Sequence, residues 1–194
     1  MIRRDRGQPS NAVRARVARG RVVSRASRSA SELLLGEWAC LGVIAEKPSH
    51  GFAVATRLAS TGDLGRIWSL SRPLTYRAID QLIGRGYIET RGEEPGIAGG
   101  QRTVLRITRS GRAALNAWLT LPVPHLRDLR SELLLKLEIG QQVGVQQASM
   151  LKEQRRIVDG IIRGLEKTID NDDIVTAWRI ESAEAARRFL DRLG

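Results

Sequence analysis

The clearest hydrophobic pattern in the chain is a stripe of apolar residues at helical spacing that follows Ser71. Its members are Leu74, Ala78, Ile79 and Leu82. A stripe of this kind predicts an amphipathic helix that packs on a core. Ser71 is a suitable N-cap, and Pro73 is tolerated because the N–H groups of a first turn have no helical partner. We therefore predict a helix that begins after Ser71 and is ended by Gly84 and Gly86.

Two stretches of alternating apolar and polar residues follow this helix and predict a β-hairpin. Residues 88–91 and 103–108 alternate as strands with one buried face do. The segment between them, GEEPGIAGGQR, is glycine-rich and carries Gln101 and Arg102 on its return side. Helix, strand, flexible tip and strand is the order of a winged helix, in which the helix enters the DNA major groove and the hairpin contacts the backbone. A plain interaction domain can have the same order.

Two more helices are predicted before this unit, which gives the order of a winged helix-turn-helix. The first extends from a capping box at Ser29 and Glu32 to about Glu46. After a turn with a cap at Pro48 and Ser49, the second extends from about His50 to Ser60, and we expect His50 to make a local hydrogen bond. The residues predicted to be buried in this second helix are Phe52, Ala55, Leu58 and Ala59.

Prolines at positions 122 and 124 follow a helix predicted over residues 109–120, with Thr108 as its N-cap, and mark a domain boundary. Three amphipathic helices follow: one near Leu126, one over residues 144–169 and one that starts at Asn171 or Asp172. The apolar residues of the last are Ile174, Trp178, Phe189, Leu190 and Leu193. These helices make a thin core alone, and a second copy of the chain would cover it.

The predicted fold is mainly α with a small β-hairpin. We divide it into a disordered basic arm over residues 1–28, a winged helix-turn-helix DNA-binding domain over 29–121 and a helical dimerisation domain over 122–194. The formal net charge of +11 is uneven, because residues 1–30 hold nine arginines against Asp5 and so carry +8, which leaves +3 for the rest. The arm has three interpretations: a segment that follows phosphates or a minor groove, a solvated tail, or the product of a start codon placed too far upstream.

Composition also argues against several classes of function. The single cysteine, Cys40, excludes an internal disulfide, and two histidines give no metal-ligand cluster, so we expect no metal and no cofactor. No Ser/His/Asp set, Cys/His pair or phosphate-cradling loop is present, and an enzyme is not expected. The longest apolar run is far short of the roughly 18 residues of a membrane span. We expect a cytoplasmic protein that binds no membrane.

Three separated motifs resemble the PadR family of bacterial transcriptional regulators. They are LLLGEWACLGVIAEKPSHGF, SRPLTYRAIDQLIGRGYIE and LRITRSGRAALNAWL, between about Leu33 and Leu119. The ending TAWRIESAEAARRFLDRL resembles the helical C-terminal region of the same family. The resemblance implies a winged-helix domain, a C-terminal dimerisation region and, often, repression relieved by a small molecule. By position it places Ser71, Thr75, Tyr76 and Arg77 in the recognition helix and Arg102 in the wing.

The sequence thus predicts a dimeric, sequence-specific DNA-binding transcriptional regulator, a repressor relieved by a small-molecule effector. Its partners would be double-stranded DNA with an inverted-repeat operator, a second copy of the chain and a small aromatic effector, for which we look first near Trp118. The alternative is a winged-helix module that binds a protein or RNA without sequence-specific binding of duplex DNA. The residues expected at the DNA are Ser71, Arg72, Thr75, Tyr76, Arg77, Gln101 and Arg102.

Overall fold

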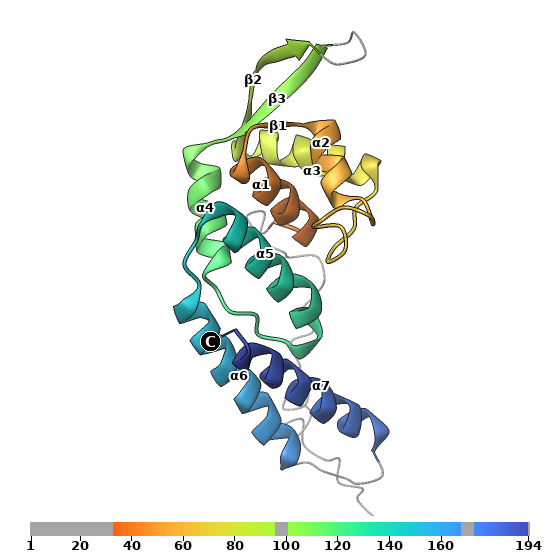
Figure 1. Cartoon of the computed structure of the whole chain (residues 1–194), viewed down its shortest axis with the longest axis vertical. Helices are drawn as coiled ribbons and strands as arrows, with labels where there is room; N and C mark the ends of the chain where they lie inside the picture. The colour runs from red at the N-terminus through yellow and green to blue at the C-terminus, as the bar shows by residue number, and fades with distance from the viewer. Residues whose placement is uncertain (1–32, 96–100, 168–172, 194) are drawn as a thin grey trace, which may run out of the picture. The chain divides into compact units, whose positions relative to one another are not determined.

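The computed structural model describes residues 33–95, 101–167 and 173–193 (Figure 1). These residues are mainly helical, with an antiparallel sheet in the strand order β1-β3-β2. The predicted fold class, mainly α with a small β-hairpin, is therefore confirmed. The basic arm and four predicted helix caps lie outside the described residues, and these caps are Ser29, Glu32, Asn171 and Asp172.

A hydrogen bond between a side chain and the backbone marks the start of each of the first two helices. The carboxylate of Glu37 accepts the backbone N–H of Leu34 at 2.6 Å, and α1 (Leu35–Glu46) starts there, later than the predicted start at Ser29. Nδ1 of His50 accepts the backbone N–H of Ala53 at 3.1 Å and caps α2 (Gly51–Leu58). The prediction that His50 makes a local hydrogen bond is confirmed.

The sequence did not predict β1 (Ser49–His50), where we expected a turn with a cap at Ser49. This strand pairs with β3 (Gln101–Ile107), and His50 lies opposite Val104. On its other side β3 pairs with β2 (Ile88–Pro95) in the predicted hairpin, which extends away from the helices in Figure 1. Two residues are too few to show an alternating pattern, so β1 could not be recognised from periodicity.

The central helix, α3 (Arg72–Gly84), has the predicted ends, and Gly86 follows it in the left-handed region with φ +68°. Its buried face agrees with the prediction at Ala78, Ile79 and Leu82 and differs only in its first residue. Leu74 is 52% exposed, whereas Thr75 is fully buried. Burial of Thr75 is possible because its hydroxyl donates to the carbonyl of Ser71 at 3.1 Å, so no polar group is left without a partner.

The helix-turn-helix core also includes a helix from the second half of the chain. Residues of α1 to α3 pack with α4 (Arg109–Leu119), whose N-cap Thr108 accepts the N–H of Gly111. Leu135 and Ile139 of α5 (Leu134–Val143) belong to this same core. The domain boundary placed after residue 121 stays a prediction.

A second core joins η1 (Leu126–Asp128) and η2 (Leu129–Leu133) to α6 (Ala148–Glu166) and α7 (Ile174–Asp191). The helices α6 and α7 lie side by side in Figure 1, and they are in contact. Our predicted helix over residues 144–169 begins later, because Gly144 instead ends α5 in the left-handed conformation. The buried residues of this core are Val123, Leu129, Leu133, Met150, Val158, Ile162, Ala183 and Leu190.

Candidate nucleic-acid interface

The exposed face of α3 carries most of the residues that were expected at the DNA. Ser71, Arg72, Tyr76 and Arg77 are exposed. Thr75 is not part of this face, because its side chain is buried and bonded within the helix. We therefore remove Thr75 from the candidate interface.

The N-terminus of α2 lies against α3 at Tyr76. A Cβ atom on Gly51 would lie 2.7 Å from Cε1 of Tyr76, which is shorter than any normal carbon contact. Glycine at position 51 therefore lets the Tyr76 ring lie against the start of α2. The arrangement brings the first residues of α2 beside the exposed face of α3.

Phe52 is a residue of this surface that the sequence analysis missed. It was predicted to be buried, yet it is 47% exposed, and the guanidinium of Arg72 lies 5.0 Å from the centre of its ring. A cation above an aromatic face is held by the ring quadrupole. The helical period could have shown the error, because the buried residues Val54, Ala55 and Leu58 define a stripe that does not include position 52.

Arg102 approaches the same surface from the sheet. Its Nη1 lies 3.4 Å from Nε2 of His50, and both side chains are partly buried. The pairing of β1 with β3 explains this contact, since His50 lies opposite Val104 and Arg102 is two residues before Val104 on the same face. Gln101 belongs to β3, but its side chain is not among those described.

We use the name DNA face for the surface made by the start of α2, the exposed side of α3 and the start of β3. Two arginines elsewhere in the helix-turn-helix and hairpin are neutralised: Arg106 pairs with Glu89, and Arg57 pairs with Glu46 and Asp63. Within the described part of the chain, no ion pair involves an arginine of the DNA face. Its residues are His50, Phe52, Arg72, Tyr76, Arg77 and Arg102.

Trp118, where we looked first for an effector, is packed in the core. Its ring stacks on Trp38 with 4.9 Å between ring centres and 6° between ring planes. Nζ of the buried Lys136 lies 5.0 Å from the Trp118 ring and donates to the carbonyl of Leu121. Burial lowers the pKa of Lys136, while its ion pair with Glu132 raises it.

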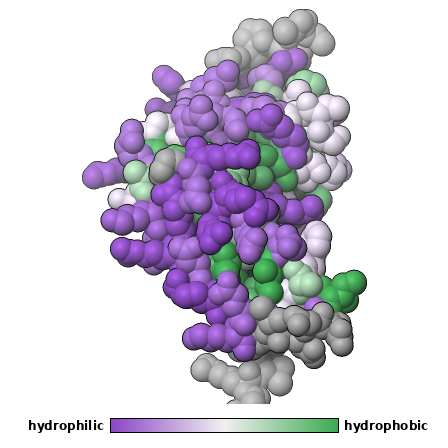
Figure 2. Space-filling model, turned by 60° about the horizontal axis from the view of Figure 1, so that its bottom comes forward, coloured by the Kyte–Doolittle hydropathy of each residue, from purple (hydrophilic) through white to green (hydrophobic). Residues whose placement is uncertain are grey.

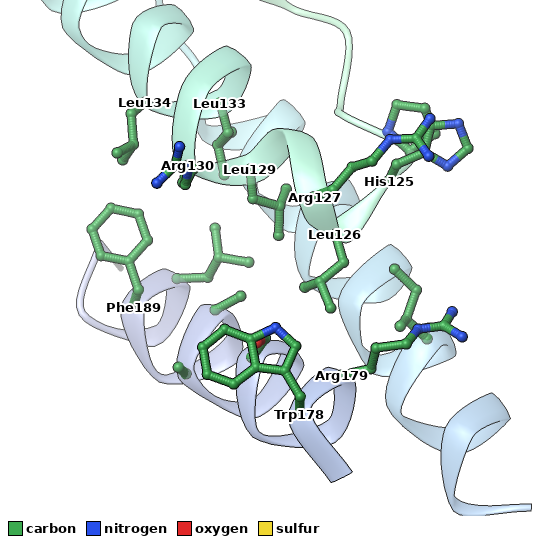
Figure 3. Close-up of a pocket in the computed structure, with 16 residues that line it drawn as sticks. His125, Leu126, Arg127, Leu129, Arg130, Leu133, Leu134, Trp178, Arg179 and Phe189 are labelled. Atoms are coloured by element: carbon green, nitrogen blue, oxygen red, sulfur yellow. The ribbon is translucent and has the colours of Figure 1, made fainter. Parts of the chain in front are cut away.

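A pocket of about 890 Å³ lies elsewhere, between the η1–η2 segment and α7. In Figure 3, Trp178 and Phe189 of α7 face Leu129 and Leu133 across the pocket. Arg127, Arg130 and Arg179 also line it, so that the apolar floor has cationic neighbours. Trp178 and Phe189 are both exposed in the single chain.

Two other kinds of site were sought over the described residues. None of the helices described is long and apolar enough to cross a membrane. Residues 33–95, 101–167 and 173–193 contain no cluster of three or more His, Cys, Asp or Glu side chains that could hold a metal ion.

Comparison with known proteins gives a family match and several structural neighbours. Residues 40–117 match the model of the transcriptional regulator PadR-like family. No curated protein matches the chain.

Similar solved structures include Bacillus subtilis PadR in complex with operator DNA, at 17% identity and a TM-score of 0.43, covering 81% of this chain and 96% of that chain. The smu.1604c protein of Streptococcus mutans UA159 is 16% identical with a TM-score of 0.42, covering 82% and 98%. Bacillus subtilis PadR in complex with p-coumaric acid is 17% identical with a TM-score of 0.39, covering 82% and 93%. The residues that match the model of the transcriptional regulator PadR-like family, 40–117, contain most of the helix-turn-helix and its hairpin.

Proposed function

We propose that this chain regulates transcription by binding a specific sequence of double-stranded DNA through the DNA face. The observation that carries the proposal is the convergence of Arg72, Arg77 and Arg102 on one surface, with no ion pair to neutralise them among the described residues. Duplex DNA presents a dense row of negative charges, and cationic side chains without an internal partner supply the complementary surface.

In this proposal the exposed side of α3 lies in the major groove. Tyr76 and Arg77 project from it toward the base edges, and arginine is the commonest reader of guanine because its guanidinium spans the O6 and N7 acceptors. Ser71 and Arg72 lie at the start of α3, and Gln101 and Arg102 lie in β3. In this proposal these four residues contact the sugar-phosphate backbone of the DNA.

We further propose that the regulator is a homodimer. Among the described residues, α7 exposes large apolar side chains, of which Ile174 is 82% and Trp178 72% exposed. Figure 2 shows a face on which polar residues dominate and apolar residues reach the surface in a few patches. A two-fold partner would cover such side chains and would set two α3 helices about 34 Å apart, which requires an inverted-repeat operator.

We also propose that the protein is a repressor that a small aromatic effector releases. The pocket beside Trp178 supports this part, because an apolar volume of about 890 Å³ lined by aromatic side chains fits an aromatic compound. Trp118 stays a predicted effector residue. A panel of aromatic compounds would be tested by thermal stability and by the separate fluorescence of Trp118→Phe and Trp178→Phe variants. Compounds that change neither stability nor fluorescence would contradict the effector.

Selection of bound sequences from random duplex DNA tests the central proposal. We expect enrichment of one inverted-repeat sequence, with a dissociation constant in the nanomolar range for the selected duplex. Recovery of no common sequence, with equal affinity for every duplex, would contradict specific recognition. A single-stranded RNA pool run in parallel addresses the alternative function, because preferential binding there would favour an RNA module.

A further inference from the structure

The capping hydrogen bond of α2 fixes the protonation of His50. Nδ1 of His50 accepts the backbone N–H of Ala53 at 3.1 Å. A backbone amide can only donate, so Nδ1 carries no proton. A neutral imidazole has one N–H, and in His50 it must therefore be on Nε2. The outer nitrogen of His50 is a donor.

This donor faces a second donor. Nε2 of His50 lies 3.4 Å from Nη1 of Arg102, and a guanidinium has no acceptor atom. Neither group can satisfy the other, although the sheet register holds them together. An acceptor placed beside both would receive two hydrogen bonds, and a negatively charged one would also neutralise Arg102.

The surroundings favour an anion at this place. The positive end of the α2 dipole lies here, because the helix begins at Gly51 directly after His50. Arg72 lies over Phe52, one residue further along α2. In the register of the hairpin, the residue of β2 that is paired with Arg102 is Glu94.

We propose that His50 and Arg102 together bind one phosphate of the DNA backbone, His50 through its neutral Nε2–H and Arg102 through its charged guanidinium. The inference rests on the proposed function, which makes duplex DNA the partner of this surface. Such a contact sets the position of the chain on the duplex and does not read its sequence. The histidine thus has two roles, since it caps α2 with one nitrogen and holds DNA with the other.

Two variants separate the two donors. His50→Asn keeps a good N-cap for α2 but removes the outer donor. We expect it to weaken binding about tenfold, as loss of a hydrogen bond to a charged group does, without a change in the slope of log K against log salt concentration. Arg102→Gln removes a charge, and we expect weaker binding together with a slope that is less steep by about 0.9.

Further variants control for folding and for Glu94. His50→Asp also caps a helix, but its charge would repel a phosphate, so binding should fall further than in His50→Asn. Glu94→Gln removes an acidic residue at the position paired with Arg102 in the hairpin, and its affinity should be equal to or greater than that of the wild type. Circular dichroism and thermal unfolding must show folded protein in each case, and His50→Asn with wild-type affinity would overturn the proposal.

A modified operator identifies the phosphate. Methylphosphonate is placed at one backbone position at a time, and we expect one position per half-site at which the wild type and His50→Asn bind equally. If no such position exists, the inference is wrong. A second experiment follows the ¹⁵N chemical shift of His50 Nε2. We expect the duplex to change this shift and inorganic phosphate alone to leave it unchanged. An equal change with both would overturn the proposal in favour of a site for free anions. The Arg77→Ala variant separates this inference from the proposed function. If Arg77→Ala loses specific binding while His50→Asn binds like the wild type, only the phosphate contact is contradicted.

Discussion

Arg77 is the residue on which sequence reading by α3 most depends. It lies on the exposed side of the helix, opposite the buried Ala78 and Ile79 stripe. We expect Arg77→Ala to weaken binding to the selected operator by about 1 to 3 kcal/mol, because a bidentate contact with a base is lost. Fluorescence anisotropy measures the change, with Arg163→Ala on the exposed side of α6 as a matched control. Equal affinity of a folded Arg77→Ala variant would remove this residue from the groove.

Cys40 should be chemically inert in the folded protein. It is fully buried in α1, and burial, with a smaller contribution from the charge of Glu37, raises the pKa of its thiol to about 12. Only the thiolate reacts quickly with disulfide reagents, so very little of the reactive form exists near neutral pH. We expect no reaction with a disulfide reagent over minutes at pH 8, and one equivalent after unfolding. Rapid reaction of native protein would show that α1 opens readily.

At single positions, the hydrophobic pattern predicted the exposed residues of α3 well. It failed for a polar residue that is buried and for an apolar residue that is exposed. Ser71, Arg72, Tyr76 and Arg77 are exposed as predicted. Thr75 was placed at the DNA by position, through the family resemblance, but its hydroxyl bonds within the helix and its methyl group can be buried. Phe52 was placed in the core because it is apolar, but the cation of Arg72 and the position outside the α2 stripe keep it at the surface. A single sequence shows neither of these pair contacts.

At the scale of elements, buried polar side chains hold the segment that follows α4. Gln154 of α6 is fully buried, and its amide accepts the N–H of Val123 at 2.7 Å and donates to the carbonyl of Val123 at 2.9 Å. Gln147 donates to the carbonyl of Leu119, and Lys136 donates to that of Leu121. This irregular segment is thus satisfied by side chains in place of secondary structure.

We expect Gln154→Leu to lower the free energy of unfolding by about 1 to 3 kcal/mol, because it leaves both polar groups of Val123 buried without partners. Urea denaturation followed by circular dichroism measures the change. Gln141→Leu, at an exposed position of α5, is the control and should change stability little. A loss no larger than that of the control would mean that Val123 finds other partners, such as water.

The long elements could be predicted because several turns or alternations repeat the same signal. The ends of α3 were predicted correctly, although Ser71 makes no side-chain capping bond, and the cap of α4 at Thr108 follows from local chemistry. The strand β1 could not be predicted, since its two residues are defined by pairing with β3. The contact of His50 with Arg102 depends on that pairing, and so it is visible only in the structure.

At the scale of the whole molecule, the net charge is concentrated in residues 1–30, which lie outside the described residues. If the arm contacts phosphates, deletion of residues 1–28 should make the slope of log K against log salt concentration less steep by about 0.9 for each lost contact. Specificity should be largely retained, because contacts of this kind do not read bases. An identical slope with and without the arm would favour a solvated tail or a start-codon artefact.

Assembly is the other property of the whole molecule, and the structure changes the way to test it. We expected a second copy of the chain to cover the C-terminal helices, but Ile162 and Leu165 of α6 are buried within the chain itself, so a charge there would disrupt folding. Trp178 is exposed on α7, and Trp178→Glu should therefore give a folded monomer. The variant should bind a full operator as weakly as a single half-site, although its α3 is unchanged, because the second recognition helix no longer arrives with the first. Sedimentation velocity measures the assembly, with Glu181→Gln on α7 as a control.

A wild-type chain that is monomeric and still binds the full operator at full affinity would contradict both the dimer and the inverted repeat.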